Sequence, residues 1–467
     1  DREVVQRAAA IVAGLPDLRE CADADRLMRG ERRSLAERDE IAKLERMLAH
    51  AVAQRHAARF APAQTLAERA LHEARALKVP AIEAEALILL GQIAADQGRF
   101  DQAAESHLRA IAAAELGGVD EARALATTEL GVVLGALQER HAEGERLLRL
   151  AAAIDQRVRA SPIQQARRDM FLGILLGKRG ALDDARQKLL SAVEALKGAP
   201  AAAGLSLISA YNALGSLEDE SGRPERARAY FGDALALAED RLGADHPDVA
   251  TVLNNIGVLE DRQGRYEAAL AAHERALAIR VRTLGPDHPE IASARMNLAV
   301  ALQHAGEIER AIAHFEATAT ALRRSPELQG RLAETLYNLA LCHFQREDFA
   351  RAVPLFEEAM ARAQAVGGPD DKVAAAALQG LAVSLVELDR LEEAQPLLDR
   401  ALRIQTARGI TPYDLAEIRF ALARVQFGRD RQRALELASA ARGDFARGGE
   451  IEMVARVDAW LQAHVQR

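Results

Sequence analysis

The chain has 467 residues, which exceeds an ordinary single domain and indicates either several domains or one extended repeat array. Its 61 Lys and Arg residues against 69 Asp and Glu residues give a formal net charge of −8, which excludes a general attraction to nucleic acid or to an anionic membrane. Hydrophobic residues make up 49% but aromatic residues only 4%, and this Ala-rich composition favours helices over strands. Two cysteines exclude a disulfide scaffold and a cysteine-only zinc site, and no apolar run is long enough for a membrane span. We therefore expect a soluble, all-α protein without a cofactor.

Residues 1–33 form an N-terminal segment with its own pattern. Residues 1–12 are predicted to form an amphipathic helix that ends at Gly14-Leu15-Pro16, and a second turn or helix is expected around Cys21. Because the chain begins with Asp1 and not with Met, we expect it to be a piece of a longer protein.

An internal repeat begins after this segment. The sequence LGADHPDVA starts at Leu242, and LGPDHPEIA starts at Leu284, 42 residues later. The same offset relates small residues and turn glycines over four consecutive units, for example Gly257 to Ala299 and Gly264 to Gly306. Each unit reads as two helices joined by a short turn, and neither helix can bury its apolar stripe without stacking on the next pair.

Ten units follow one another along the chain. The third unit is irregular, because its turn at residues 138–143 lacks a glycine and carries one extra residue, and the tenth is one residue short between Ala423 and Ala434. A final helix at residues 450–465 is predicted to cap the array, with Ile451, Val454, Val457, Trp460 and Leu461 on one stripe. The ten units start near Lys43, Ala84, Ala124, Ala166, Ile208, Ala250, Ala292, Ala333, Ala375 and Ala416.

This pattern resembles the tetratricopeptide repeat, which has Leu-Gly or Leu-Ala in the first helix and spaced small residues across both helices. The 42-residue period and the Leu-Gly-x-Asp-His-Pro linker resemble the longer variant of kinesin light chains and many bacterial regulators. The resemblance implies a right-handed α-α superhelix of about ten helix pairs. The predicted organisation is a helical adapter at residues 1–33, a repeat array at 34–448 and a capping helix at 449–467.

The N-terminal segment carries a second resemblance. Glu3-Val-Val-Gln-Arg-Ala, Gly14-Leu-Pro and Cys21-Ala-Asp-Ala-Asp are similar to the segment that leads into the repeats of large bacterial serine/threonine protein kinases of the myxobacterial kind. This implies an upstream kinase domain in the same polypeptide, although the chain itself has no kinase motif. The compartment stays open, since such a region lies in the cytoplasm or, after a membrane helix, outside it. Cys21 is accordingly either a free thiol or, outside the cytoplasm, one half of a disulfide.

Motifs that would carry chemistry are better explained by the repeat. Gly173-Ile-Leu-Leu-Gly177-Lys178 lacks the spacing and the hydroxyl residue of a phosphate loop, and Gly173 is a packing position of the array. His246 and His288 occupy equivalent Asp-His-Pro turns, where a turn is favoured over a metal site and Asp245 and Asp287 are expected to accept from free amides. Histidines 107, 273 and 314 are expected to be hydrogen-bonded residues at the edge of the core, and Cys342 a small buried hydrophobe.

A row of asparagines is the main functional prediction. Asn212, Asn254, Asn255, Asn297 and Asn338 all occupy the fifth or sixth place of a first helix. In tetratricopeptide arrays the first helices line the concave groove, and the resemblance implies that such asparagines hold the main chain of a bound peptide. A carboxamide both donates and accepts, so it satisfies an extended backbone without reading its sequence. The alternative is that the asparagines only bond between neighbouring helices. Further groove candidates are Thr251, Asp261, Arg262, Gln303, His304, Tyr337, Phe344 and Gln345.

Three functions remain open at this point. The first is a scaffold that binds a protein or peptide partner, and the second is the C-terminal sensor or docking region of a serine/threonine kinase. The third is a stand-alone regulator whose superhelix changes when a signal peptide or small ligand binds. An enzyme is disfavoured, because the repeat already explains every residue that could serve as a catalytic acid, base or nucleophile.

Overall fold

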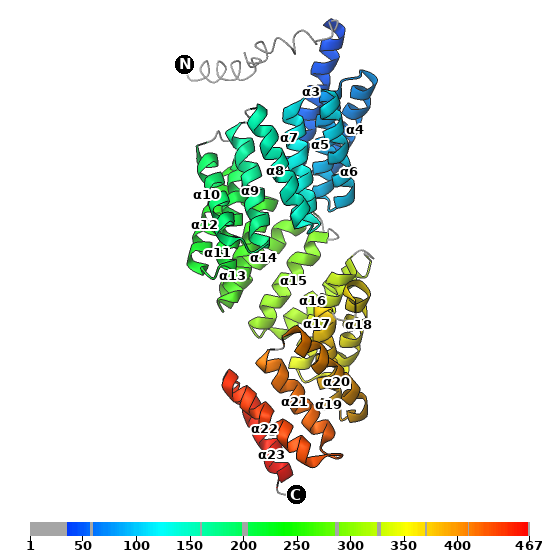
Figure 1. The fold of residues 1–467 in the computed structure, drawn as a ribbon, viewed down its shortest axis with the longest axis vertical. Coiled ribbons are helices and arrows are strands. Elements are labelled where there is room, and N and C mark those ends of the chain that lie inside the picture. The colour runs from blue at the N-terminus through cyan, green and yellow to red at the C-terminus, as the bar shows by residue number, and fades with distance from the viewer. Residues whose placement is uncertain are drawn as a thin grey trace. The chain divides into compact units, whose positions relative to one another are not determined.

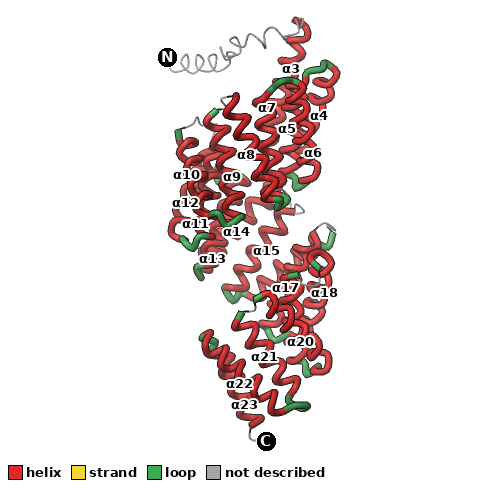
Figure 2. The backbone as a smooth tube through the Cα atoms, viewed as in Figure 1, coloured by secondary structure: helices red, strands yellow, loops and turns green. Residues whose placement is uncertain are grey.

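The structure is a computed structural model that describes residues 35–56, 59–158, 161–198, 204–284, 289–324, 328–368, 371–409 and 411–465. All regular elements in these ranges are helices joined by short turns (Figures 1 and 2). The predicted adapter at residues 1–33, with Cys21, lies outside the described residues, as do Asp287 and His288. The chain divides into two compact units, residues 1–199 and 200–467, called here the N-terminal and C-terminal units.

The described part of the N-terminal unit contains four helix pairs, in which each helix packs against the next along the chain. Its elements are α3 (Leu35–His56), α4 (Phe60–Ala76), α5 (Pro80–Asp96), α6 (Phe100–Leu116), α7 (Asp120–Val132), the π-helical turn η1 (Val133–Leu137), α8 (His141–Val158), α9 (Pro162–Lys178) and α10 (Leu182–Lys197).

The described part of the C-terminal unit contains six helix pairs and a cap. Its elements are α11 (Gly204–Glu220), α12 (Pro224–Leu242), α13 (Pro247–Arg262), α14 (Tyr266–Leu284), α15 (Pro289–His304), α16 (Ile308–Leu322), α17 (Gln329–Gln345), α18 (Phe349–Gly367), α19 (Lys372–Glu387), α20 (Leu391–Arg408), α21 (Pro412–Gln426), α22 (Arg431–Gly448) and α23 (Ile451–Val465). The prediction of an all-α solenoid of stacked helix pairs is confirmed.

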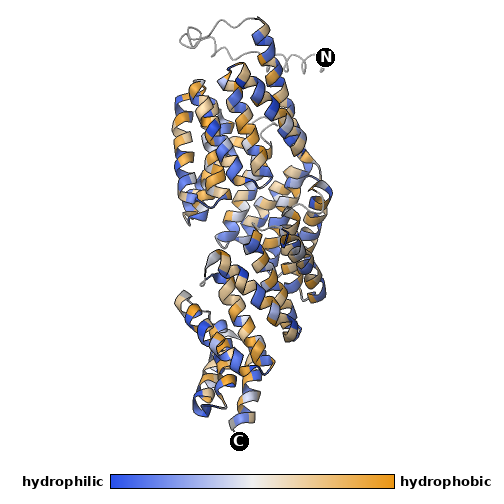
Figure 3. Cartoon of the chain, turned by 90° about the vertical axis from the view of Figure 1, so that its right-hand side faces the viewer, coloured by the Kyte–Doolittle hydropathy of each residue, from blue (hydrophilic) through white to orange (hydrophobic). Residues whose placement is uncertain are grey.

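The amphipathic pattern of each helix explains the stacking. Apolar and hydrophilic residues alternate along the helices rather than forming long blocks (Figure 3). The buried stripes consist mostly of Ala and Leu, with one large ring in several second helices, such as Phe231, Phe315 and Phe356. Because alanine lets paired helices approach closely, a core with few aromatic residues still fills its space. Turns such as the one at Gly264, which has a φ of +70°, reverse the chain between the helices of a pair.

The irregular third pair shows how the extra residue is accommodated. The first helix of this pair, α7, continues as the π-helical turn η1, and a π turn takes up one additional residue. Glu139 then adopts a φ of +58° in the turn, where several other pairs have a glycine. The extra residue is thus taken up inside the helix and the turn, and α8 still packs against α7.

Two local predictions need correction. His246 is the N-cap of α13, and its Nδ1 accepts from the backbone N–H of Asp248 at 3.2 Å, whereas Asp245 forms an ion pair with Arg282 and not a cap. In the cap helix α23, Val457 is fully buried, but Ile451 is 81% exposed and does not belong to the packed stripe. Ile451 is the first residue of α23, so its side chain lies outside the part of α23 that packs on the preceding helices.

Candidate functional site

First helices of successive pairs contact each other directly in the C-terminal unit. Contacts join α11 to α13, α13 to α15, α15 to α17, α17 to α19 and α19 to α21. Since these helices meet across successive pairs, they form one continuous face, called here the first-helix face, and in a curved solenoid such a face is the inner one. The predicted site residues are all on four of these helices: Asn212 on α11; Thr251, Asn254, Asn255, Asp261 and Arg262 on α13; Asn297, Gln303 and His304 on α15; Tyr337, Asn338, Phe344 and Gln345 on α17.

Four of the five asparagines pair across neighbouring helices. Asn255 Nδ2 donates to Asn212 Oδ1 at 2.9 Å, and Asn297 Nδ2 donates to Asn254 Oδ1 at 2.8 Å. In each pair, the asparagine at the sixth place of one unit donates to the asparagine at the fifth place of the preceding unit. Each pair consumes one donor and one acceptor, so each carboxamide keeps further hydrogen-bonding capacity. The asparagines therefore do link neighbouring helices, and this linkage leaves groups for a ligand.

A second polar row follows the same diagonal near the C-terminal ends of these helices. Arg262 pairs with Asp219 at 2.7 Å and His304 Nδ1 with Asp261 at 2.9 Å. The third interaction of this row is a hydrogen bond of 3.2 Å from Gln303 Nε2 to Gln345 Oε1. Between the asparagine row and this row lie Val258, Val300 and Leu341, all partly exposed. The first-helix face thus has two polar rows with an apolar stripe between them.

The asparagine row ends on α17 because its next partner is missing. Met296 occupies the fifth place of its unit, where Asn212 and Asn254 stand in theirs. Within the described residues, the side-chain amide of Asn338 and the hydroxyl of Tyr337 have no hydrogen-bond partner, although both residues are only partly buried. Two adjacent residues on α17 therefore offer polar groups that the fold does not use.

The ring of Tyr337 is anchored while its hydroxyl is free. The ring lies 6.0 Å from that of Phe356, and burial raises the pKa of the hydroxyl to about 12, with the charges of Asp414 and Glu417 adding to the rise. The hydroxyl is therefore protonated at neutral pH and can donate as well as accept. Tyr337 combines a fixed ring with an available hydrogen-bonding group.

Thr251 and Phe344 have other neighbours. The Thr251 hydroxyl donates to the carbonyl of Pro247 at 3.3 Å and accepts from Arg280 of α14 at 3.4 Å. The Phe344 ring packs edge-on against Phe349, at the start of α18, with 5.3 Å between the ring centres. Both residues lie on the predicted helices but at the margin of the two rows.

Sequence reasoning missed polar residues that continue the face on α19 and α21. Gln379 Nε2 donates to Glu417 Oε2 at 2.7 Å and to Asp414 Oδ1 at 3.3 Å. Burial raises the pKa of Glu417, and Asp414 raises it further. Gln379 stands at the fifth place of its unit, like Asn212, so a search by position in the unit rather than by residue type would have found it.

A comparable row in the N-terminal unit was also missed. Arg55 on α3 donates to Gln92 on α5 at 2.9 Å, and Gln92 donates to Glu129 on α7 at 2.9 Å. Arg167 on α9 completes the row with a 3.3 Å contact to Glu129. First helices in both units are therefore joined by side-chain bonds, but with different chemistry.

Gly173 and Cys342 are both packed inside helix pairs. Gly173 lies inside α9, where an added Cβ would meet Leu189 at 2.8 Å, so it is a packing position and not part of a phosphate loop. Cys342 is fully buried, and burial raises the pKa of its thiol to about 12. In the described ranges, no group of three or more His, Cys, Asp or Glu side chains is placed to hold a metal ion. No helix in those ranges has the length and apolarity to cross a membrane.

His107 and His273 differ from the prediction of hydrogen-bonded residues at the core edge. Both are buried, and neither the two ring nitrogens of His107 nor Nδ1 of His273 has a hydrogen-bond partner. Each ring packs directly against a glycine of the first helix in its pair, Gly91 and Gly257. The two histidines therefore fill the place that phenylalanine takes in other pairs.

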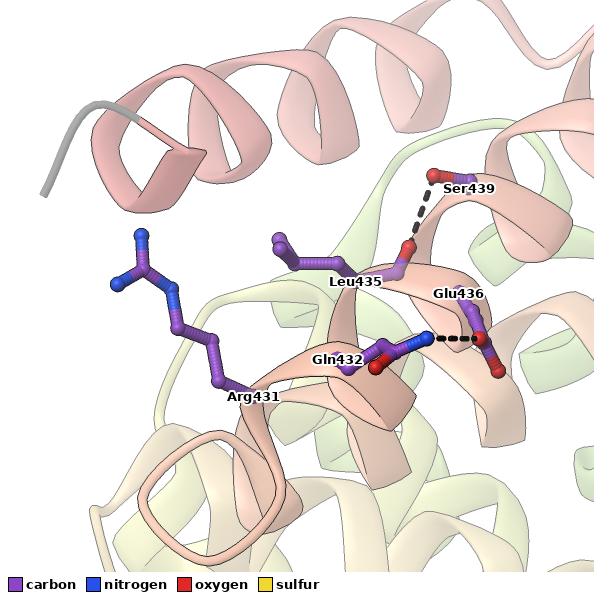
Figure 4. A pocket seen from close by; sticks show the side chains of 5 residues that line it. All are labelled: Arg431, Gln432, Leu435, Glu436 and Ser439. Atoms are coloured by element: carbon purple, nitrogen blue, oxygen red, sulfur yellow. Dashed lines mark hydrogen bonds between the residues drawn. The ribbon is translucent and has the colours of Figure 1, made fainter.

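A hollow of about 790 Å³ near the C-terminus is a weaker candidate than the first-helix face. Its lining comes from one helix, α22, and consists of Arg431, Gln432, Leu435, Glu436 and Ser439 (Figure 4). Gln432 bonds to Glu436, Ser439 to the carbonyl of Leu435, and Arg431 to the carbonyl of His464. The hydrogen bonds of these polar groups are thus largely made within the protein itself.

Comparison with known proteins identifies the repeat. Models of the tetratricopeptide repeat match residues 86–118, 206–281, 248–324 and 331–407. No curated protein matches the chain.

Solved structures share the fold at low identity. A signal transduction ATPase with numerous domains and a tetratricopeptide repeat sensor, from Pyrococcus horikoshii, is 16% identical with a TM-score of 0.59, covering 78% of this chain and 55% of that one. The apo form of the quorum sensor NprR from B. thuringiensis is 16% identical with a TM-score of 0.55, covering 79% of this chain and 99% of that one. A putative kinesin light chain from P. anserina with nearly identical repeats is 20% identical with a TM-score of 0.39, covering 44% of this chain and 97% of that one. Together with the helix pairs described above, the matched repeats show that the chain is a tetratricopeptide-repeat protein.

Proposed function

We propose that the chain is a non-catalytic scaffold that binds a segment of a partner protein or peptide along the first-helix face of the C-terminal unit. The observation that carries this proposal is the end of the asparagine row on α17, where the Asn338 amide and the Tyr337 hydroxyl have no partner in the described part of the protein. Partly exposed polar groups that the fold leaves unused are suited to a ligand.

The arrangement of the face supports a simple binding mode. Peptide amides and carbonyls would bond to the carboxamides of Asn338 and of the asparagine pairs. Apolar side chains of the same segment would lie over Val258, Val300 and Leu341. The carboxamides contribute affinity for any backbone, while residues of the second polar row, such as His304 and Gln345, would select among side chains.

Two finer assignments follow from different evidence. The similarity of residues 1–33 to a kinase segment supports a docking or sensor region of a serine/threonine protein kinase. The likeness in fold to the quorum sensor NprR, over 79% of this chain and with a TM-score of 0.55, favours a second candidate, a regulator that senses a signal peptide. A change in the scattering profile at saturating peptide would support the sensor, and an unchanged profile would support a passive scaffold.

Asparagine variants separate a binding role from a structural one. Asn338→Ala is expected to leave the free energy of unfolding unchanged and to weaken peptide binding about tenfold, because its amide bonds to nothing in the described protein. Asn255→Ala is expected to lower the free energy of unfolding by about 1 kcal/mol, because it leaves the side-chain oxygen of Asn212 without its donor. Stability is measured by urea denaturation, and binding by fluorescence anisotropy of peptides selected on the wild-type chain from a random display library.

Tyr337→Phe is the companion variant, because it removes only the free hydroxyl and keeps the ring against Phe356. It too should weaken binding without loss of stability. If neither Asn338→Ala nor Tyr337→Phe alters the affinity of any selected peptide, the proposed site on α17 is wrong. If Asn338→Ala destabilises the protein as much as Asn255→Ala does, the whole row is structural.

A further inference from the structure

A groove lies on the first helices of the N-terminal unit, away from every residue assigned above to the binding face. It has a volume of about 350 Å³ and is lined by residues of α3, α5 and α7, of which α3 contacts α5 and α5 contacts α7. Leu48, Ile88 and Leu89 form a buried apolar floor, to which Val52 and Leu125 add partly covered side chains. The volume is near the lower end of ligand-binding pockets and suits a few side chains of a larger partner.

The polar lining of this groove has one sign of charge. Glu45 on α3 and Glu85 on α5 are exposed at its edge, and neither has a hydrogen bond or ion pair within the described residues. No Lys, Arg or His is among the lining residues. Partial burial of its carboxyl group against the groove raises the pKa of Glu85, and the neighbouring charge of Glu45 raises it further.

Within the described residues, several carboxylates of these three helices have an ionic partner, unlike Glu45 and Glu85. On the same helices, Asp96 is paired with Arg55, Glu129 with Arg167 and Glu83 with Arg75. The two carboxylates at the groove repel each other across neighbouring helices, and a cation between them would remove that repulsion. The neighbouring Gln92 is uncharged and therefore cannot supply this cation; its side-chain amide donates to Glu129 and its side-chain carbonyl accepts from Arg55.

We infer that this groove is a second recognition site, which binds a partner segment that carries a Lys or Arg next to an apolar residue. The apolar side chain lies on Leu48, Ile88 and Leu89, and the cation lies between Glu45 and Glu85. Charge complementarity selects this occupant, since an acidic or purely apolar segment would leave two like charges at the rim uncompensated. The chemistry differs from that of the C-terminal unit, where the asparagine row offers neutral carboxamides.

The inference rests on the proposed function only in taking the partner to be a peptide segment, and the two sites are tested apart. Peptides are selected from a random display library on the full chain. Their affinities are then measured for the wild type, for Glu45→Gln/Glu85→Gln and for Asn338→Ala. The matched control is Glu68→Gln/Glu105→Gln, which removes the same charge from the exposed faces of α4 and α6.

The expected result is a class of peptides with Lys or Arg beside Leu, Ile, Val, Met or Phe. The affinity of these peptides falls about tenfold with Glu45→Gln/Glu85→Gln. It does not change with Asn338→Ala or with the control variant. Added salt should also lower the affinity of these peptides, because their recognition is ionic.

Other outcomes overturn one proposal or the other. If selected peptides depend on Asn338 but none depends on Glu45 and Glu85, the groove is not a site and the proposed function stands. If the peptides that depend on the two glutamates lack a basic residue, the assigned chemistry is wrong. If Glu45→Gln/Glu85→Gln instead dissociates a dimer of the chain in sedimentation, the occupant is a second copy and not a peptide. A library that yields no binding peptide refutes both sites.

Discussion

Replacing Gly144 with alanine is expected to lower the free energy of unfolding of the N-terminal unit by about 3 kcal/mol or more. A Cβ at this position on α8 would overlap the Cα of Gly135, and it would lie 2.6 Å from the carbonyl oxygen of Gly131 and 2.8 Å from the backbone nitrogen of Gly135. All three neighbours are backbone atoms, so no side chain can rotate away to make room. The two helices would have to separate at the π-helical turn, which would open the packing around Leu148.

Gly232→Ala is the matched control, because it adds the same methyl group inside a helix where no atom lies within 4 Å of the new Cβ. Alanine has the higher helix propensity, so this variant should be more stable by about 0.5–1 kcal/mol. Urea denaturation followed by circular dichroism measures both changes. Equal stability of the two variants would show that the helices can separate freely at the third pair.

The sequence predicted the fold because its strongest signals are local and periodic. The 42-residue offset and the three- and four-residue spacing within helices depend on sequence alone, and they specify helix pairs that must stack. The irregular third unit was visible as one extra residue, but not the way in which the helix accommodates it. A π turn, rather than a longer loop, takes up this residue, and Gly135 of the π turn closely approaches Gly144 of α8, a contact between two helices that no local pattern encodes.

The candidate site was only partly predictable for a related reason. Position in the unit placed the asparagines on first helices, but bonding between neighbouring units depends on the diagonal between helices. That diagonal joins Asn255 to Asn212 and Asn297 to Asn254, and it leaves Asn338 opposite Met296. The free amide of Asn338 is therefore a property of two helices together, and a search for one residue type along the chain cannot reveal it.

Acid is expected to destabilise the protein through His107 in the N-terminal unit and His273 in the C-terminal unit. Both are buried, and burial lowers the pKa of each imidazole from 6.5 to about 4. Since the folded state disfavours the charged ring, the unfolded chain binds more protons between these pH values. The stability contributed by the neutral ring is complete above pH 6.5 and is lost as the pH falls toward 4, by about 3 kcal/mol for each histidine.

Phenylalanine is the substitution that tests this effect, because the array already uses it at the same place. Phe231 and Phe315 stand 42 residues before and after His273, and both are almost fully buried. The Phe231 ring also meets Gly215 as the His273 ring meets Gly257, with contacts of 2.5 and 2.6 Å from an added Cβ. His273→Phe should therefore fit, and it removes a ring nitrogen that has no hydrogen-bond partner.

The variants His107→Phe and His273→Phe are expected to be more stable than the wild type by about 1 kcal/mol at neutral pH. The difference should widen by about 3 kcal/mol per histidine near pH 4, where carboxylate titration affects both proteins alike and cancels. Urea denaturation across this pH range measures it, with the exposed His72→Gln as a control that should follow the wild type. A stability difference that stays constant with pH would mean that the two buried rings accept a proton without cost, by opening to water or by moving to a partner. The neutral rings would then not be a source of acid sensitivity in either unit.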